Sequence, residues 1–279
     1  IPNEAEKQLT LLAVGGYGRK ELFPHSDIDL LIVCENPESH HDAISRFLHG
    51  LYDLNLEIGH AVRTIKECKK EAKTDITVAT AMFERRFLAG SKSIALALGT
   101  MLQSPRLWPS KKFYTAKYEE QISRHRQFDN VEYGLEPNIK SSPGGLRDLQ
   151  TVFWVLDREF GTTNVHALEE LGILNPEESA KLDEGRRYLW WIRYGIHLIS
   201  GRKEDRLLFE YQRELSQKLG FADTKARLGV ERFMQLYYQH ILDLREANDI
   251  LLQHFEEAIL RSNERPELEV IDKNFQIRN

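Results

Sequence analysis

Residues 11–33 read LLAVGGYGRKELFPHSDIDLLIV, and two strands are predicted around this stretch. The first covers residues 9–14, an apolar run that stops at Gly15-Gly16 and is therefore typical of a buried strand. The second covers residues 28–33, where an alternating start gives way to solidly apolar residues, as in a strand covered on both faces. We therefore expect the N-terminal region to be built on a sheet.

Two acidic residues, Asp27 and Asp29, lie at the start of the second strand. They are two positions apart, so both carboxylates point to the same face. Neighbouring carboxylates repel each other unless a cation lies between them, and Mg²⁺ prefers such hard oxygen ligands together with substrate phosphates. Two ions ~3.5–4 Å apart stabilise both the attacking and the leaving oxygen of a phosphoryl displacement. The pair predicts a Mg²⁺ site, which Mn²⁺ is also able to fill.

A purely structural role for the acid pair is the alternative. Asp27 would then cap a turn after Pro24, and Asp29 would begin an exposed strand. However, Ile28 and residues 30–33 are expected to be buried, and an acid in such a strand requires a partner. The metal site is therefore favoured.

The residues between the two strands predict a phosphate site. Gly15 and Gly16 let the backbone approach a phosphate closely, and a helix starting at about Gly16 would aim its free N–H groups at it. Arg19 adds positive charge, and Ser26 is a further candidate contact to a nucleotide. One short segment thus combines a phosphate cradle with a metal pair.

A dinucleotide-binding fold is a competing hypothesis, because Gly16-Tyr17-Gly18 follows a strand and Glu35 ends the next one. The third glycine of that pattern is replaced by Glu21, and Pro24 limits the intervening helix to about two turns. A parallel crossover needs a longer connection. The dinucleotide fold is therefore not favoured.

Three further elements are predicted in the N-terminal region. Apolar residues at helical spacing indicate a helix over residues 40–54, alternation indicates a strand over 56–62, and a second helix is predicted over 75–88, with Gly90 as its stop. His40-His41-Asp42 superficially suggests a metal phosphohydrolase. No matching His and Asp set accompanies this motif, so it is interpreted as a solvated surface at a helix start.

The chain from about residue 105 to 260 is predicted to be helical almost throughout, apart from a Pro- and Gly-containing loop at 136–145. Three stripes of apolar residues at helical spacing support this prediction. They are Leu146, Leu149, Val152, Phe153, Leu156 and Phe160; Leu189, Ile192, Ile196 and Ile199; and Phe233, Leu236, Tyr237, His240, Ile241 and Leu244, extended by Leu251, Phe255 and Leu260.

Composition limits the classes of protein. The 279 residues carry a net charge of -5, whereas a dedicated nucleic-acid binder usually has a basic excess, so a nucleotide or protein substrate fits better than nucleic acid. The two cysteines, Cys34 and Cys68, form no metal-binding or disulfide framework, which favours a reduced, cytoplasmic setting. The apolar runs are too short to span a bilayer, and no signal-peptide pattern is present, so no membrane partner is expected.

Several motifs together identify a family. Residues 15–29 resemble the glycine-and-acid segment of the bacterial bifunctional PII uridylyltransferase/uridylyl-removing enzymes, within the polymerase-beta-like nucleotidyltransferase superfamily. Residues 136–140 and 144–150 resemble a second motif of these enzymes. A third motif comprises His197, Gly201-Arg202, Asp205-Arg206-Leu207 and Gln212. The resemblance covers nearly the whole chain.

The resemblance implies an α/β plus α fold: a small mixed-sheet nucleotidyltransferase domain over residues 1–105 and a helical domain over 106–265 that closes over the nucleotide. Residues 266–279 would be a linker toward a hydrolase domain. The implied activity is transfer of UMP from UTP to a tyrosine hydroxyl of the nitrogen-signalling protein PII. The family enzymes continue into a metal-dependent hydrolase domain and glutamine-sensing domains, so this chain is expected to keep the transferase alone.

The resemblance also implies site residues. Asp27 and Asp29 would bind metal, and the superfamily requires a third carboxylate on a neighbouring strand, for which Glu57 is the first choice. Asp75 is the alternative, although a residue before a predicted helix is more simply an N-terminal cap. The nearest alternative functions are an adenylyltransferase with another protein acceptor and a degenerate nucleotide-binding regulatory domain. The intact acid pair argues against the degenerate domain.

The loop before the first helical stripe offers two cations, Lys140 and Arg147, beside a Gly-Gly helix start. Both are predicted to reach the triphosphate from the helical domain. The alternative is a well-capped loop between domains in which Arg147 and Asp148 form a solvated ion pair.

Overall fold

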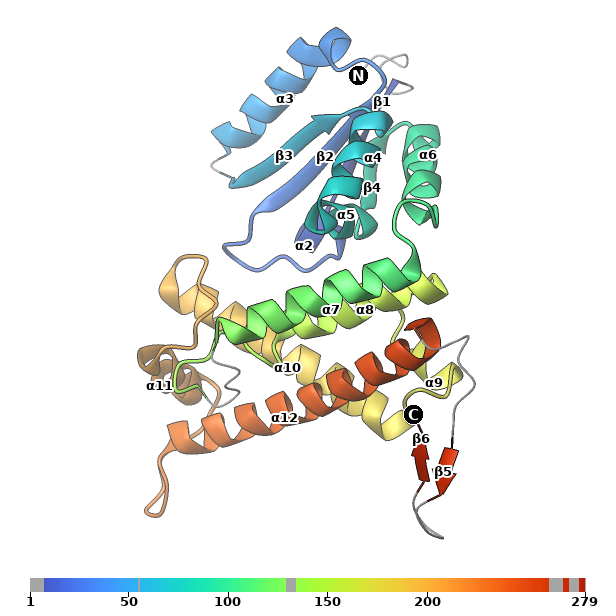
Figure 1. Ribbon diagram of the computed structural model, residues 1–279. Coiled ribbons are helices and arrows are strands. Elements are labelled where there is room, and N and C mark those ends of the chain that lie inside the picture. The colour runs from blue at the N-terminus through green and yellow to red at the C-terminus, as the bar shows by residue number, and fades with distance from the viewer. Residues whose placement is uncertain (1–7, 55, 129–133, 261–267, 271–275, 279) are drawn as a thin grey trace.

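The computed structural model describes residues 8–54, 56–128, 134–260, 268–270 and 276–278 (Figure 1). A four-stranded sheet forms the N-terminal part, with the strand order β3-β2-β1-β4. The parallel pair is β2 with β3, and β1 is antiparallel to both β2 and β4, so the sheet is mixed as predicted. Its strands are β1 (Leu9–Ala13), β2 (Ile28–Cys34), β3 (Ile58–Arg63) and β4 (Arg86–Gly90).

Helices cover both faces of this sheet, which explains why the end of β2 is apolar throughout. On one face, α3 (His41–Asp53) packs Ile44 and Leu48 against Ile32. The other face is covered by three helices that bury Leu12, Leu31 and Val33 in the main core. These helices are α4 (Ile65–Thr74), α5 (Ile76–Phe83) and α6 (Lys92–Gln103).

The helix predicted over residues 75–88 is wrong in its second half. α5 ends at Phe83, and β4 follows as a strand paired with β1, with Ala13 opposite Arg86 and Thr10 opposite Gly90. Gly90 therefore ends a strand at a φ of 93° instead of stopping a helix. The alternating exposure of β4 is typical of an edge strand, and its pairing with β1 is a long-range interaction that outweighs local helical spacing.

The connection between β1 and β2 excludes the dinucleotide fold. The helix between them, α2 (Gly15–Gly18), has four residues, and the two strands are antiparallel rather than linked by a parallel crossover. The His40-His41-Asp42 motif behaves as a solvated surface, since His41 and Asp42 are exposed at the start of α3, after the short η1 (Glu38–His40).

The second part of the chain is helical, as predicted, and its helices pack beneath the sheet in Figure 1. The helices α7 and α8 run alongside each other next to the sheet domain, and α10 and α12 lie beyond them. Residues 136–145 form no helix. The elements are α7 (Ser110–Arg126), α8 (Leu146–Phe160), α9 (His166–Glu170), α10 (Pro176–Ser200), α11 (Phe209–Lys218), α12 (Gly229–Phe255) and η2 (Glu256–Leu260).

The apolar stripes predicted from spacing form one core that is continuous with the core under the sheet. Leu149, Ile192 and Ile241, one from each stripe, are buried. Phe160, at the end of the first stripe, is partly exposed. Both cysteines are buried and free. No helix in the described residues has the length and apolar character needed to cross a bilayer.

The predicted linker at residues 266–279 falls partly outside the described residues. Its described parts are two short strands, β5 (Leu268–Val270) and β6 (Gln276–Arg278), which pair antiparallel.

Candidate active site

A cavity of about 360 Å³ opens between the sheet and the helical part, and residues from both line it. The sheet side contributes the glycine loop, the acid pair and one face of α5. The helical side contributes cations from α7, α8, α10 and two loops. Eight of the predicted site residues line this cavity: Gly15, Gly16, Arg19, Ser26, Asp27, Asp29, Lys140 and Arg147.

Asp29 is held at the base of the cavity by its place on β2. Its backbone carbonyl accepts a hydrogen bond from Val14 N at 3.0 Å, which ties the strand to the start of the glycine loop. A Cβ on Gly15 would lie 3.2 Å from Asp29 Oδ2, and a Cβ on Gly59 would lie 2.5 Å from Oδ1. Glycine at both positions thus leaves space around this carboxylate. Burial, and then the charge of Asp27, raise the pKa of Asp29.

Asp27 is half-exposed at the mouth of the cavity and already has a cationic partner. The ammonium of Lys203 lies 2.5 Å from Asp27 Oδ1. Burial acts to raise the pKa of Asp27, but the hydrogen bond and charge of Lys203 prevail and hold it below its ordinary value. A cation therefore sits where the acid pair was predicted to attract one, and the two carboxylates form a donor set that suits Mg²⁺.

Arg19 and Ser26 line the cavity, yet both are engaged within the protein. The Arg19 guanidinium contacts Glu84 Oε2 at 2.5 Å and Glu21 Oε2 at 2.7 Å, so two carboxylates offset its charge. Ser26 Oγ accepts a hydrogen bond from Phe23 N at 3.2 Å and closes the turn before Asp27. Their contacts to a nucleotide remain predictions.

Lys140 and Arg147 are held side by side by the loop that joins α7 to α8. Arg147 N donates to Lys140 O at 2.8 Å, and Asn138 Oδ1 accepts from Lys140 N at 3.1 Å. Neither side chain has an ion-pair partner in the described part of the chain. Burial, and then the charges of Arg147 and Arg193, lower the pKa of Lys140 to about 8.

The predicted solvated pair of Arg147 and Asp148 is not formed. Asp148 is buried, where its carboxylate pairs with Arg124 and His125 and accepts from Gly144 N at 2.8 Å. Asp148 therefore stabilises the start of α8, and the Arg147 guanidinium is left facing the cavity.

Neither candidate third carboxylate lines the cavity. Glu57 is exposed just before β3, where its carbonyl accepts from Ile28 N at 2.8 Å, next to Asp27 at the start of the parallel pair. Asp75 caps α5, since its Oδ1 accepts from Thr77 N at 2.7 Å, as the capping hypothesis predicted. Among the described residues, no three His, Cys, Asp or Glu side chains are arranged to hold a metal ion.

Comparison with known proteins now identifies the family. Residues 112–252 match the model described as GlnD PII-uridylyltransferase, and residues 3–88 match the nucleotidyltransferase domain model. The chain belongs to the GlnD PII-uridylyltransferase family. The first of these matched regions lies within the helical part of the chain.

Similar members of the GlnD PII-uridylyltransferase family are bifunctional uridylyltransferase/uridylyl-removing enzymes. The Pseudomonas aeruginosa UCBPP-PA14 protein is 44% identical over 276 residues, which are 98% of this chain and 31% of that protein. The Stutzerimonas stutzeri A1501 protein is 45% identical over 273 residues, or 97% and 30% of the two chains. The Azotobacter vinelandii protein is 44% identical over 276 residues, or 98% and 31%. The chain thus spans about a third of the length of these relatives.

Four further cations that line the cavity of this GlnD family member were not predicted from the sequence: Lys117, Arg124, Arg193 and Lys203. Lys117 and Arg124 are seven residues apart on α7, a spacing that places them on the same face as the buried Gln121. Polar residues at buried helical positions were therefore the available signal. No sequence pattern indicated Lys203, because it lies on a loop and reaches Asp27 only through the tertiary structure.

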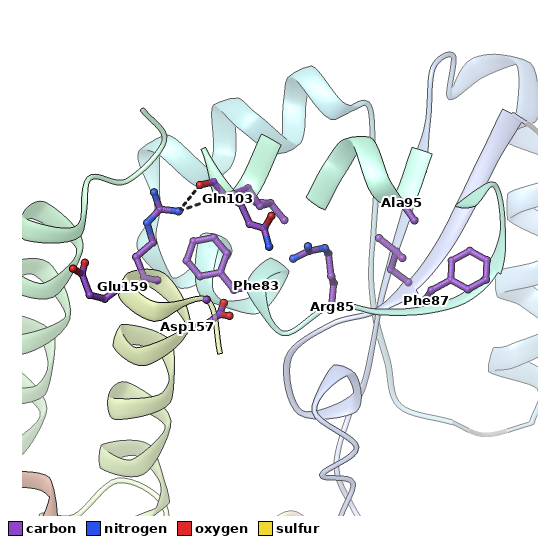
Figure 2. A pocket seen from close by; sticks show the side chains of 11 residues that line it. Phe83, Arg85, Phe87, Ala95, Gln103, Asp157 and Glu159 are labelled. Carbon is purple, nitrogen blue, oxygen red and sulfur yellow. Dashed lines mark hydrogen bonds between the residues drawn. The ribbon is translucent and has the colours of Figure 1, made fainter. Parts of the chain in front are cut away.

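A second cavity, of about 640 Å³, is lined by residues from the end of α5, from β4 and α6, and from the end of α8 (Figure 2). It is lined by apolar residues, including Phe83 and Phe87, and by Arg85 and Asp157 from the two parts of the chain. It contains neither the acid pair nor the glycine loop. The smaller cavity is therefore the candidate active site of this GlnD family member.

Proposed function

We propose that this chain transfers UMP from UTP to a tyrosine hydroxyl of a PII-type signalling protein. The observation that carries the proposal is the composition of the smaller cavity. Its sheet side presents Asp27 and Asp29, and its helical side presents Lys140 and Arg147, two partly buried cations with no carboxylate within ion-pair distance in the described residues. Such cations repel each other, and a triphosphate bound between them and the acid-bound metal would remove that repulsion.

The residues present fit a divalent metal. Asp27 and Asp29, with Glu57 proposed as a third ligand, would hold Mg²⁺, or Mn²⁺ in its place. When bound, Mg²⁺ would lower the pKa of the acceptor hydroxyl and neutralise the leaving pyrophosphate. Gly15 and Gly16 would allow a phosphate to approach the backbone, and Lys203 would leave Asp27 when the metal is bound there.

The helical side would bind the polyphosphate and keep water out of the site. Arg147 donates up to five N–H groups in a planar fork, which suits phosphate oxygens, and Lys140 adds a compact charge. The backbones of Lys140 and Arg147 are joined by a hydrogen bond, which keeps the two residues close together. A single ligand is therefore expected to contact both side chains. We place the boundary between the sheet domain and the helical domain near residue 105, which leaves the cavity between the two domains.

The family supports the identity of the substrates. The matching model is described as a PII-uridylyltransferase, and the similar proteins are named for both attaching and removing uridylyl groups. The physical features of the cavity support a nucleoside triphosphate and a metal, whereas UTP and PII are proposed from the family membership.

The test is to incubate the chain with PII, Mg²⁺ and each of the four labelled nucleoside triphosphates in turn. We expect label on a PII tyrosine from UTP, and much less from the others. Label from ATP alone would make the chain an adenylyltransferase. Tight UTP binding without any transfer would leave a degenerate regulatory domain.

A further inference from the structure

Glu84 lies where the two parts of the chain meet, and its carboxylate is bound from both sides. It follows the last residue of α5, and its backbone N–H donates to Thr80 O at 3.2 Å. One carboxylate oxygen contacts Arg19 Nη1 at 2.5 Å, and the other accepts from Trp154 Nε1 at 2.5 Å. Trp154 is on α8, in the helical part, and Arg19 ends the glycine loop, in the sheet part. Glu84 therefore connects the two sides of the active-site cavity.

On the sheet side, the Glu84–Arg86 turn supports the glycine loop at several points. Arg86 donates to Tyr17 O at 2.8 Å and lies over the Tyr17 ring at 4.9 Å. A Cβ on Gly18 would lie 2.0 Å from Glu84 O, so the loop packs directly against the backbone of this turn. Any movement of Glu84 is thus transmitted to the loop proposed to receive the phosphate.

On the helical side, Trp154 organises the cations. Its ring lies 4.0 Å from Lys117 Nζ and 5.4 Å from the Arg147 guanidinium carbon. The side chain is buried, so these contacts are shielded from water, where cation–π attraction is strongest. The position of Trp154 therefore influences where Arg147 can lie.

A buried carboxylate is a poor choice for stability alone. Removing such a charge from water is costly, and a well-packed apolar residue of the same volume often stabilises the fold as much or more. Glu84 is nevertheless enclosed, with 8% of its side chain exposed. Hydrogen bonds depend steeply on angle. A carboxylate that accepts from both Arg19 and Trp154 therefore fixes the relative position of these two donors more closely than apolar packing would.

We propose that Glu84 and Trp154 are positioning residues for the nucleotidyl transfer proposed above. Their hydrogen bond holds the glycine loop and the acid pair at a set distance from Lys140 and Arg147, so that one nucleotide contacts both sides of the cavity. The inference rests on that proposed function, because the distance matters only if a ligand bridges the two sides.

The test compares Trp154→Phe with Trp191→Phe, a matched change on the exposed face of α10. Trp154→Phe keeps an aromatic ring and removes the N–H donor to Glu84. We expect kcat for UMP transfer to fall about tenfold to a hundredfold, because misplacing a substrate by about 1 Å can cost that much, with a smaller change in UTP affinity by calorimetry. Trp191→Phe should match the wild type in both.

A double-mutant cycle with Glu84→Gln separates positioning from general weakening. The single changes break the same link, so the double variant should be no slower than the slower single variant. If the fold-losses in kcat of the two single variants multiply in the double variant, the two residues act independently and the proposal is overturned. A kcat of Trp154→Phe equal to that of Trp191→Phe would also overturn it. Thermal unfolding identifies variants that fail to fold. If one single variant fails to fold, the other decides alone, and an undiminished kcat in it would equally refute the link.

The outcomes also separate this inference from the proposed function. If the wild-type chain transfers no UMP to PII, the proposed function fails before any variant is compared. If the wild type is active and the variants at positions 84 and 154 are equally active, only the positioning role fails.

Discussion

The two sides of the active-site cavity are built in different ways. The acidic side comes from one short segment, in which a glycine loop and a strand place Gly15, Asp27 and Asp29 together. The cationic side draws Lys117, Lys140 and Lys203 from separate helices and loops of the helical part. A local hairpin geometry suffices for the first side, whereas the second requires the complete packing of the helices.

The two sides also differ in how exposed their charged groups are and in how their pKa values are shifted. The acidic side is half-exposed, and a nearby cation, Lys203, holds the pKa of Asp27 down while burial raises that of Asp29. The cationic side is more enclosed, and Lys140 has its pKa lowered to about 8 by burial and by neighbouring cations. Substitutions on the acidic side should therefore act mainly on the chemical step, and those on the cationic side mainly on binding.

The largest effect is expected from the acid pair. Asp27→Asn or Asp29→Asn should abolish UMP transfer, a loss of about a thousandfold or more, because a neutral amide binds Mg²⁺ poorly and the metal is needed for the charge at the reacting oxygens. Radioactive transfer from UTP to PII measures the loss, and circular dichroism checks the fold. Asp42→Asn, on the exposed start of α3, is the matched control and should be fully active. Near-normal transfer by either cavity variant would refute the metal pair.

The second-largest effect is expected from the third carboxylate of the acidic side. Glu57→Gln should reduce kcat much more than Asp75→Asn does, since the Glu57 carbonyl accepts a hydrogen bond from Ile28 N, one residue after Asp27, and Asp75 caps α5. Asparagine is itself a good N-cap, so Asp75→Asn should leave stability within about 0.5 kcal/mol of the wild type. Transfer assays on both folded variants decide the matter. The opposite order of kcat values would show that Glu57 is not the third ligand and that Asp75 is the better candidate.

On the cationic side, Lys140→Ala and Arg147→Ala should each weaken UTP binding by about tenfold to a hundredfold. Hydrogen bonds to charged groups contribute about 1.5–3 kcal/mol, which corresponds to this range. Calorimetric titration with UTP and Mg²⁺ measures the affinity. Lys66→Ala, which removes an exposed cation from α4, should bind UTP normally. If the Lys140 and Arg147 variants also bind normally, these residues serve only to cap the loop.

The smallest effect is a pH dependence of nucleotide affinity. Lys140 has a pKa of about 8, so it is charged below pH 8 and loses its charge as the pH rises above that value. UTP affinity should therefore fall as the pH is raised from 7 to 9, by up to about tenfold, because a neutral amine no longer attracts phosphate. Lys140→Arg stays charged throughout and serves as the control for titration of the nucleotide itself. The same slope in both proteins would show that Lys140 does not face the phosphates.

Much of the fold followed from local patterns. The first three strands, the long helices and the non-helical loop at 136–145 were predicted from apolar spacing and from glycine and proline positions, whereas the mixed sheet was implied by the family resemblance. The error at residues 84–90 has a clear cause: β4 forms because β1 offers it an open edge, and that edge lies more than 70 residues earlier in the chain, as in the pairing of Thr10 with Gly90. Strand propensity depends strongly on such pairing.

In the candidate site, too, the residues of one local segment were predicted, whereas their long-range partners were not. Asp27 directly precedes β2 and Asp29 lies on it, two positions later, so one short segment after the glycines supplies both carboxylates and its sequence predicted the pair. The partners of these residues were not predicted. Lys203 meets Asp27 across 176 residues, and Trp154 meets Glu84 across 70. Such contacts depend on how whole helices pack, a free-energy balance over many distant side chains that no short segment contains.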